Sequence, residues 1–101
     1  MITFGLLASH RGSNARAVVE ACRVGRLDAH PGVIISNNAD SGVLEFAKSA
    51  GVPAFRIGGP DYADEAVRDR AILRTLESHG VDIVLLLGYM KLLGPLTTAA
   101  Y

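Results

Sequence analysis

The sequence contains a single cysteine, no tryptophan and no excess of either charge. Ten lysine and arginine residues balance ten aspartate and glutamate residues, and no run of like charge occurs. This balance disfavours binding to a nucleic-acid backbone or to an anionic membrane surface. The lone Cys22 has no second cysteine to pair with inside the chain, which is typical of a reducing compartment. We therefore expect a cytoplasmic protein whose ligand is a small molecule.

Long hydrophobic runs are also absent. The longest apolar run, residues 83–87, is far shorter than the roughly 20 residues that a helix needs to cross a bilayer. The start of the chain fits a buried strand rather than a secretion signal. With 101 residues, of which 50% are hydrophobic, the chain is predicted to form one domain with its own core, over residues 1–101.

Two nucleotide-binding fingerprints are missing from the loops. The Gly-x-Gly-x-x-Gly pattern of dinucleotide sites does not occur, and neither does the Gly-Lys-Ser or Gly-Lys-Thr of nucleotide hydrolases. The three histidines, His10, His30 and His79, fall on separate predicted elements, and none stands at metal-ligand spacing from Cys22. We therefore expect neither NAD nor a metal ion.

Apolar runs alternate along the chain with segments of helical period. Strands are expected over residues 2–8, 32–36, 54–57 and 82–87. Helices are expected from Ser13 to about Gly25, up to about Ala50, over Tyr62 to His79, and in a last short helix opened by Pro95. Such alternation predicts βαβ units and hence a Rossmann-like α/β fold, a parallel sheet with helices on both faces.

The third predicted helix carries most of the charge. Asp61 is expected to cap it, and charged residues that include Arg68 and Asp69 are expected mostly on its solvated face. The residues expected to face inward are Ala66, Ile72, Leu73 and Leu76. With strands numbered along the chain, a 3-2-1-4 order would leave the apolar fourth strand at the edge. We therefore expect a homo-oligomer or a partner chain that covers this strand.

The first strand-to-helix turn has the features of an anion site. Ser13 stands at the expected N-cap, and Gly12 lets a ligand come close to the backbone. The first N–H groups of a helix have no partner inside it, and the peptide dipoles add partial positive charge there. Arg11 can share the anion. Such a turn can also contain Gly and Ser only to turn and cap the chain, so both interpretations stay open on these residues alone.

Four short motifs occur in order, each at the end or beginning of a predicted element: Gly12-Ser13-Asn14, Ile35-Ser36-Asn37, Ala50-Gly51-Val52-Pro53 and Gly88-Tyr89-Met90-Lys91-Leu92-Leu93. In this combination the whole chain resembles the phosphoribosylglycinamide formyltransferases. The resemblance implies the N-terminal half of the formyltransferase fold. It also implies transfer of a formyl group from 10-formyltetrahydrofolate to the amine of glycinamide ribonucleotide, a step of purine biosynthesis.

The resemblance assigns binding roles to two of these motifs. It implies that Gly12, Ser13 and Asn14 hold the 5′-phosphate of the substrate, with Arg11 beside them. Residues Tyr89, Met90, Lys91, Leu92 and Leu93 would border the ribonucleotide and folate pockets. Without the resemblance, ordinary core packing explains Met90, Leu92 and Leu93 equally well. The chain departs from the commoner family pattern at Ser9, His10 and Arg11, where small residues are frequent.

No catalytic residue is assigned within the chain. The Asn, His and Asp of the family's reaction are expected beyond Tyr101, so this chain would supply the ribonucleotide-phosphate site and be inactive alone. His10 would contact solvent or the anion. The alternatives are another folate-dependent formyltransferase, a formyltetrahydrofolate deformylase, or a phosphate- or nucleotide-binding module without catalysis. The Gly12 to Asn14 phosphate turn argues against the other enzymes.

Overall fold

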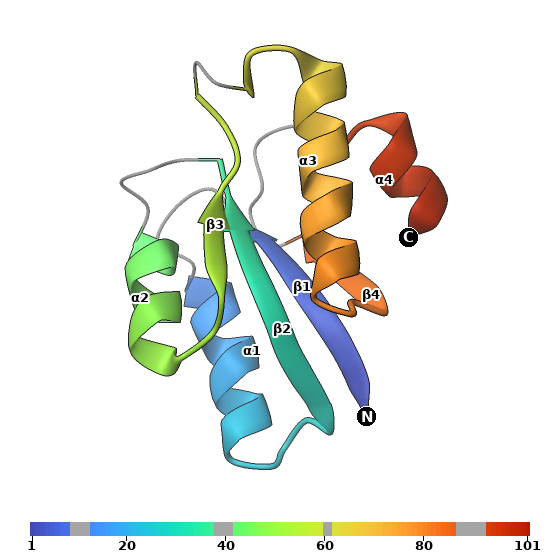
Figure 1. The fold of residues 1–101 in the computed structure, drawn as a ribbon. Helices are drawn as coiled ribbons and strands as arrows, with labels where there is room; N and C mark the ends of the chain where they lie inside the picture. The colour runs from blue at the N-terminus through green and yellow to red at the C-terminus, as the bar shows by residue number, and fades with distance from the viewer. Residues whose placement is uncertain (9–12, 38–41, 60–61, 87–92) are drawn as a thin grey trace.

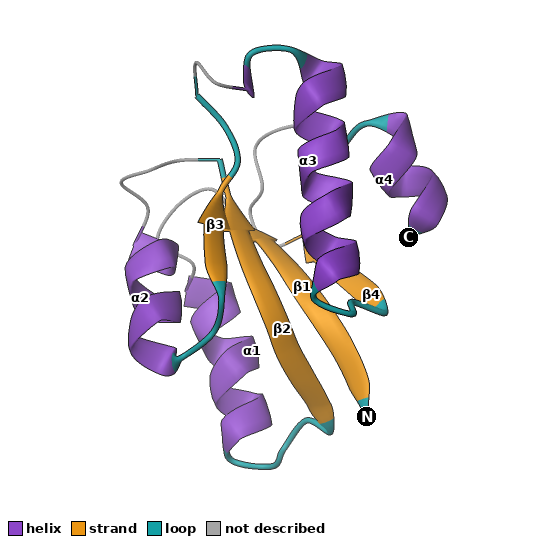
Figure 2. Ribbon diagram, viewed as in Figure 1, coloured by secondary structure: helices purple, strands orange, loops and turns teal. Residues whose placement is uncertain are grey.

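A computed structural model describes residues 1–8, 13–37, 42–59, 62–86 and 93–101 of the chain. Helices and strands alternate along these residues, as Figure 2 shows. The strands are β1 (Ile2–Ala8), β2 (Ala29–Ser36), β3 (Ala54–Arg56) and β4 (Ile83–Leu86). The helices are α1 (Ser13–Arg23), α2 (Gly42–Ala50), α3 (Glu65–Ser78) and α4 (Pro95–Ala100). The predicted elements are thereby confirmed, with shifts of a few residues at their ends.

The strands form one parallel sheet in the order β3-β2-β1-β4 (Figure 1), which confirms the order expected from the sequence. Strand β1 pairs with β2 over its whole length, from Ile2 beside Ala29 to Ala8 beside Ser36. On its other side β1 pairs with β4, where Leu7 lies beside Leu86. Because parallel strands end at one edge, the segments that follow all four strands leave the sheet there.

Strand β2 begins three residues earlier than predicted, at Ala29 instead of Gly32. It runs through Pro31, which has no N–H to donate to a neighbouring strand. The pairing with β1 shifts at this point, because Phe4 lies beside Pro31 and Gly5 beside Val33. Gly32 is thus the extra residue of a bulge. Pairing with the central strand therefore carries β2 past its proline.

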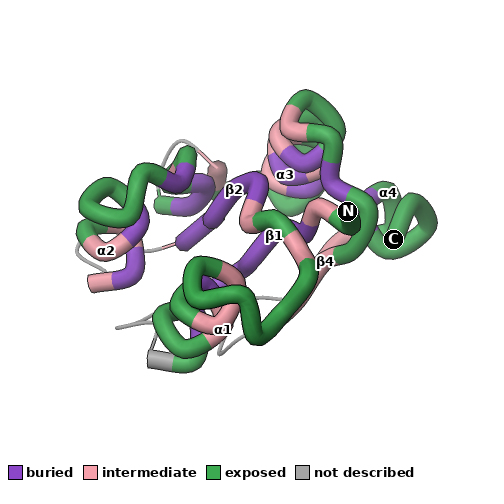
Figure 3. Tube along the Cα trace, turned by 90° about the horizontal axis from the view of Figure 1, so that it is seen from below, coloured by how far each residue is buried: buried purple, intermediate pink, exposed green. Residues whose placement is uncertain are grey.

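Helices cover both faces of the sheet, with buried residues between the layers (Figure 3). Under α1 and α2 the core contains Phe4, Leu6, Ala15, Val19, Ile34, Val43 and Ala47. Under α3 it contains Leu7, Val33, Ile35, Ile72, Leu76 and Val81. Neighbouring residues of β1 and β2 therefore point into different cores, as expected of strands buried on both faces. Helix α4 packs against α3 (Figure 1).

Three helices end where the sequence predicts. Gly25, Gly51 and Gly80 follow α1, α2 and α3 with φ angles of +80°, +74° and +65°. This left-handed backbone is strained for residues with a side chain, which explains why glycine stands there. No helix in the described ranges is long and apolar enough to cross a membrane.

The start of α3 differs from the prediction. Asp64 is its N-cap, and the carboxylate oxygen Oδ1 of Asp64 accepts the N–H groups of Ala66 at 2.8 Å and Val67 at 3.3 Å. The helix therefore begins at Glu65 and not at Tyr62. Asp61, the expected cap, lies outside the described residues. Ala66 is exposed and was wrongly expected to face inward, because it lies in the first turn of α3, before the buried positions of the helix begin at Asp69.

Candidate functional site

The two segments predicted to bind ligands leave the sheet from adjacent strands. Residues 9–12 follow β1 and residues 87–92 follow β4, and these strands are paired up to Leu7 and Leu86. The carboxyl ends of β1 and β4 therefore lie beside one another at one edge of the sheet. In parallel α/β proteins this edge is where ligands bind.

The predicted phosphate turn is only partly described. Ser13 is the first residue of α1, and Asn14, the second, is exposed. The first turn of α1 carries no acidic residue, so no carboxylate of that turn opposes an anion at the positive end of the helix dipole. Arg11 and Gly12, together with His10, lie outside the described residues.

The predicted folate segment is described at its last residue alone. Leu93 is half-buried and packs against the core beneath α3. Core packing, the alternative that the residues themselves left open, therefore accounts for the position of Leu93. Tyr89, Met90, Lys91 and Leu92 lie outside the described residues.

Asn37, the residue after β2, stands at the same edge. Its side-chain oxygen Oδ1 is buried and, within the ranges that the structure describes, is the one such buried side-chain N or O atom without a hydrogen-bond partner. A Cβ atom at Gly58 would overlap the backbone carbonyl of Asn37, so the segment after β3 approaches Asn37 directly. A buried acceptor of this kind is suited to an N–H or O–H donor of a ligand.

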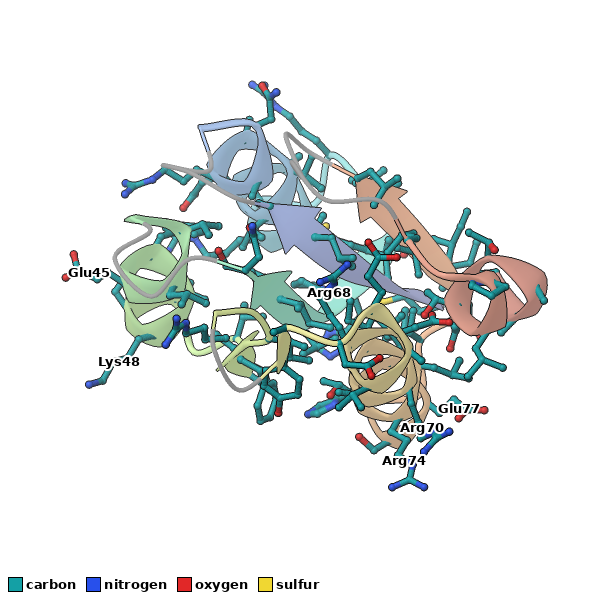
Figure 4. The ribbon with its side chains drawn as sticks, turned by 90° about the horizontal axis from the view of Figure 1, so that it is seen from above. Glu45, Lys48, Arg68, Arg70, Arg74 and Glu77 are labelled. Atoms are coloured by element: carbon teal, nitrogen blue, oxygen red, sulfur yellow. The ribbon has the colours of Figure 1, made fainter. Side chains whose placement is uncertain are left out.

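Arg68 corrects one expectation from the sequence. It was expected on the solvated face of α3, but its side chain is only 11% exposed. In Figure 4 it extends from α3 across the carboxyl edge of the sheet, whereas Arg70 and Arg74 point outward. Its guanidinium makes only long contacts with other described residues, donating to the Tyr62 carbonyl oxygen at 3.4 Å and lying 4.0 Å from the Glu65 carboxylate. This cation is therefore suited to an anionic group at the edge.

Asp69 corrects a second expectation, because it too was placed on the solvated face and is only 3% exposed. Its carboxylate accepts the backbone N–H groups of Leu96 and Thr97 at the start of α4. Burial raises the pKa of Asp69, but hydrogen bonds from Thr97 and Leu96 and the charge of Arg68 outweigh burial and hold the pKa below its usual value. Asp69 is therefore ionised at neutral pH.

The sequence does contain a signal for both buried charges. Asp69 stands three residues before Ile72 and seven before Leu76, and Arg68 stands four before Ile72. This spacing places them on the apolar stripe of α3 or at its border. The burial of Arg68 and Asp69 is therefore missed when every charged residue of the helix is assigned to its solvated face.

A cavity of 540 Å³ lies at the opposite edge of the sheet, between α1, α2 and the start of β2. Cys22, Phe46 and Pro31 are among its lining residues. Burial raises the pKa of the Cys22 thiol, so less of it is present as the reactive thiolate. No three His, Cys, Asp or Glu side chains gather as a metal site requires in the part of the chain that is described.

A parallel sheet with βα segments converging on its carboxyl edge defines a Rossmann-like protein with its ligand site at that edge. Comparison with known proteins narrows this class. The model of the formyl transferase family matches residues 4–101, and the chain belongs to this family.

Individual relatives agree with the resemblance drawn from the motifs. The chain is 31% identical to the phosphoribosylglycinamide formyltransferase of Bacillus subtilis, over 100% of this chain and 52% of the relative. It is 34% identical to that of Haemophilus influenzae, over 100% of this chain and 48% of the relative. The chain thus spans about half the length of these relatives.

Solved structures agree with the fold. Glycinamide ribonucleotide transformylase 1 from Geobacillus kaustophilus matches with a TM-score of 0.95 and 35% identity, over 100% of this chain and 54% of that chain. The enzyme of the same name from Symbiobacterium toebii matches with a TM-score of 0.90 and 41% identity, over 98% and 47%. A formyltetrahydrofolate deformylase from Pseudomonas putida KT2440 shares the fold at 20% identity.

Proposed function

We propose that the chain supplies the ribonucleotide-binding half of a cytoplasmic phosphoribosylglycinamide formyltransferase of purine biosynthesis. In this proposal Arg11, Gly12, Ser13 and Asn14 hold the 5′-phosphate of glycinamide ribonucleotide. The relatives named above support the substrate, because their names state it.

One observation supports phosphate binding at the start of α1. Helix α1 begins at Ser13, five residues after β1 ends at Ala8, and has no acidic residue in its first turn. The peptide N–H groups at such a start point out of the helix and attract a phosphate group. The short connection keeps these groups at the carboxyl edge. A glycine at position 12 removes a side chain from the path of the ligand.

The formyl donor, 10-formyltetrahydrofolate, is proposed to lie along residues Tyr89 to Leu93. This segment follows β4, the neighbour of β1, and ends at the core residue Leu93. The substrate amine attacks the formyl carbon, which requires a donor to the developing oxyanion and a carrier for the amine proton. The proposed residues of this chain bind the two reactants and perform neither task, so we expect binding without turnover.

Isothermal titration calorimetry with two matched ligands tests the phosphate site. Glycinamide ribonucleotide is titrated against the same compound without its phosphate. We expect the phosphate to strengthen binding at least about tenfold, or about 1.4 kcal/mol. Equal affinities would overturn the site. A formylation assay on the same sample tests the expectation that the chain binds the reactants without catalysing formyl transfer. Turnover by the 101-residue chain would contradict that expectation.

Two valine variants test whether the phosphate binds at the turn before α1. Gly12→Val places a branched side chain in the turn, and we expect it to weaken ribonucleotide binding at least about tenfold, or about 1.4 kcal/mol. The control, Ala17→Val, adds the same side chain at an exposed position of α1 and is expected to leave affinity unchanged. Unaltered affinity in Gly12→Val would refute the assignment.

We further propose that a second copy of the chain covers the free edge of β4. Ile83 and Leu86 on this strand are 50% and 55% exposed, and among the described strands β4 pairs only with β1. Exposed apolar edge strands pair readily with another chain. Light scattering at rising protein concentration is expected to show dimers, and Ile83→Lys is expected to shift the protein toward monomers. A wild-type monomer at high concentration would contradict this proposal.

A further inference from the structure

Arg68 is a buried cation without a close partner among the described residues. It is the fourth residue of α3, and its side chain is only 11% exposed. Its Nη1 donates to the Tyr62 carbonyl oxygen at 3.4 Å, and its Nη2 lies 4.0 Å from the carboxylate of Glu65, whose side chain is 87% exposed. Both contacts are longer than a strong hydrogen bond or a close ion pair, so most of the N–H groups of the guanidinium stay available.

The neighbouring carboxylate of Asp69 does not occupy these N–H groups. It accepts the N–H of Leu96 at 2.8 Å, the N–H of Thr97 at 3.0 Å and the Thr97 hydroxyl at 2.6 Å, all at the start of α4. Between the two described residues Arg68 and Asp69 no direct ion pair forms. The hydrogen-bonding capacity of Asp69 is therefore directed at α4.

The position of Arg68 makes an unpaired charge unfavourable. The positive end of the helix dipole lies at the start of α3, and it opposes a cation in the first turn. Burial also removes much of the water that would solvate the guanidinium, and a buried charge is costly unless it is paired. An anion that binds Arg68 would relieve both effects.

The free nitrogens of Arg68 can be reached from outside. Nε and Nη2 donate no hydrogen bond within the described part of the chain, and neither is among its fully buried N and O atoms without a partner. Both nitrogens are therefore open to solvent. In Figure 4 the side chain extends from α3 across the carboxyl edge of the sheet, whereas Arg70 and Arg74 point outward. The buried stem thus holds the guanidinium at the edge where parallel α/β proteins bind ligands.

We propose that Arg68 binds an oxyanion of a ligand at the carboxyl edge, with paired N–H groups of its planar guanidinium on two oxygens of the anion. The choice of ligands rests on the proposed function, in which both reactants carry such a group. The ribonucleotide carries a phosphate, and the formyltetrahydrofolate carries the carboxylates of its glutamate. Phosphate and carboxylate both match the fork of an arginine, and the two reactants are therefore tested separately.

The alternative is a purely structural role for Arg68. It lines a cavity of 150 Å³ together with the carboxylates of Glu65 and Asp69, whose negative charge disfavours an anion inside this cavity. If Arg68 only balanced these two charges, its removal would lower stability and either spare ligand binding or weaken every ligand alike. Selective loss of the anionic ligand therefore distinguishes binding from a structural role.

A titration of the wild-type chain with inorganic phosphate tests the anion site directly. NMR follows the Nε–H signal of Arg68, which is identified by its absence in Arg68→Met. We expect this signal to shift and to saturate, and the signal of the outward Arg70 to shift less and without saturation. An Arg68 signal that does not respond, or that follows Arg70, would overturn the inference.

Calorimetry with the reactants identifies the source of the oxyanion. Glycinamide ribonucleotide is compared with its form without phosphate, and 10-formyltetrahydrofolate with 10-formyltetrahydropteroate, which lacks the glutamate. We expect Arg68→Met to weaken at least one complete reactant about tenfold or more, and to change its analogue less than about twofold. The matched control Arg70→Met removes the same group from an exposed position of α3 and should leave every affinity unchanged.

A second variant keeps the calorimetry decisive if Arg68→Met fails to fold. Arg68→Lys keeps the charge but loses the fork, and we expect it to weaken the same reactant about threefold or more and to spare its analogue. Unchanged affinity for both complete reactants in the folded variants, or equal losses for a reactant and its analogue, would overturn the inference and leave the proposed function intact. A wild type that binds neither reactant would overturn the proposed function, and the phosphate titration would still decide the role of Arg68.

Discussion

Helices α1 and α4 each follow one of two neighbouring strands, β1 and β4, and neither has an acidic residue in its own first turn, but a carboxylate from α3 meets the first turn of α4. The first turn of α1 contains no acidic residue, and a ribonucleotide phosphate is proposed to bind there. At α4 the buried carboxylate of Asp69 accepts two of the first N–H groups. The same backbone chemistry can thus serve a ligand in one place and join two helices in the other. The position of an acidic side chain decides between these uses.

The largest effect is expected from removing the carboxylate at α4. Asp69→Ala leaves the buried N–H of Thr97 and the partly buried N–H of Leu96 without their acceptor, and the Thr97 hydroxyl keeps only the longer bond to the backbone carbonyl oxygen of Asp69 at 3.2 Å. We expect the unfolding free energy to fall by about 3 kcal/mol. Urea denaturation measures this loss. The control, Asp28→Ala, removes the same group from an exposed position and should cost less than about 0.5 kcal/mol. Equal losses in the two variants would show that the hydrogen bonds between Asp69 and the start of α4 contribute nothing to stability.

A smaller effect is expected from crowding the same contact. Gly94→Ala places a Cβ against Asp69, and overpacking of this kind costs about 1–3 kcal/mol. In the Asp69→Ala background the same change should cost much less, because the carboxylate that it meets is gone. A double-mutant cycle by urea denaturation measures the difference. If the losses in unfolding free energy are additive, a direct contact between position 94 and the Asp69 carboxylate is contradicted.

A third prediction concerns the loss of stability at acid pH. The pKa of Asp69 is lower in the folded chain than in the unfolded chain, because hydrogen bonds and Arg68 outweigh burial. Its contribution to stability is therefore full above the unfolded pKa of about 3.9 and is lost as pH falls through the folded value. Denaturation midpoints between pH 5 and acid pH should fall more for the wild type than for Asp69→Asn. Parallel pH profiles would contradict an ionised Asp69.

Prediction from sequence worked best where local and tertiary preferences agree. The bounds of β1 and the strand order are confirmed, because an apolar run followed by a helix leaves few ways to build a parallel sheet. The glycines after α1, α2 and α3 are confirmed for a local steric reason. The early start of β2 was missed, because it depends on pairing with β1 across a bulge.

The site was harder to predict from the sequence. Burial of Arg68 and Asp69 was missed, because a charged residue looks solvated until its partners are known, and those of Asp69 are 27 and 28 residues away. The unpartnered oxygen of Asn37 depends likewise on tertiary contacts. The ligand roles of Arg11 to Asn14 and Tyr89 to Leu93 stay predictions, which the motifs and the topology support.

The smallest stability effect belongs to the most direct test of the account, the substitution Asn14→Asp. An acidic residue in the first turn of α1 should stabilise the helix, by about 0.3–1 kcal/mol, yet repel a bound phosphate. The control Ala66→Asp adds the same charge to the first turn of α3. Calorimetry with glycinamide ribonucleotide is expected to show at least about tenfold weaker binding, or about 1.4 kcal/mol, for Asn14→Asp alone, with its stability unimpaired. Undiminished affinity of Asn14→Asp would contradict the claim that the start of α1 binds the phosphate.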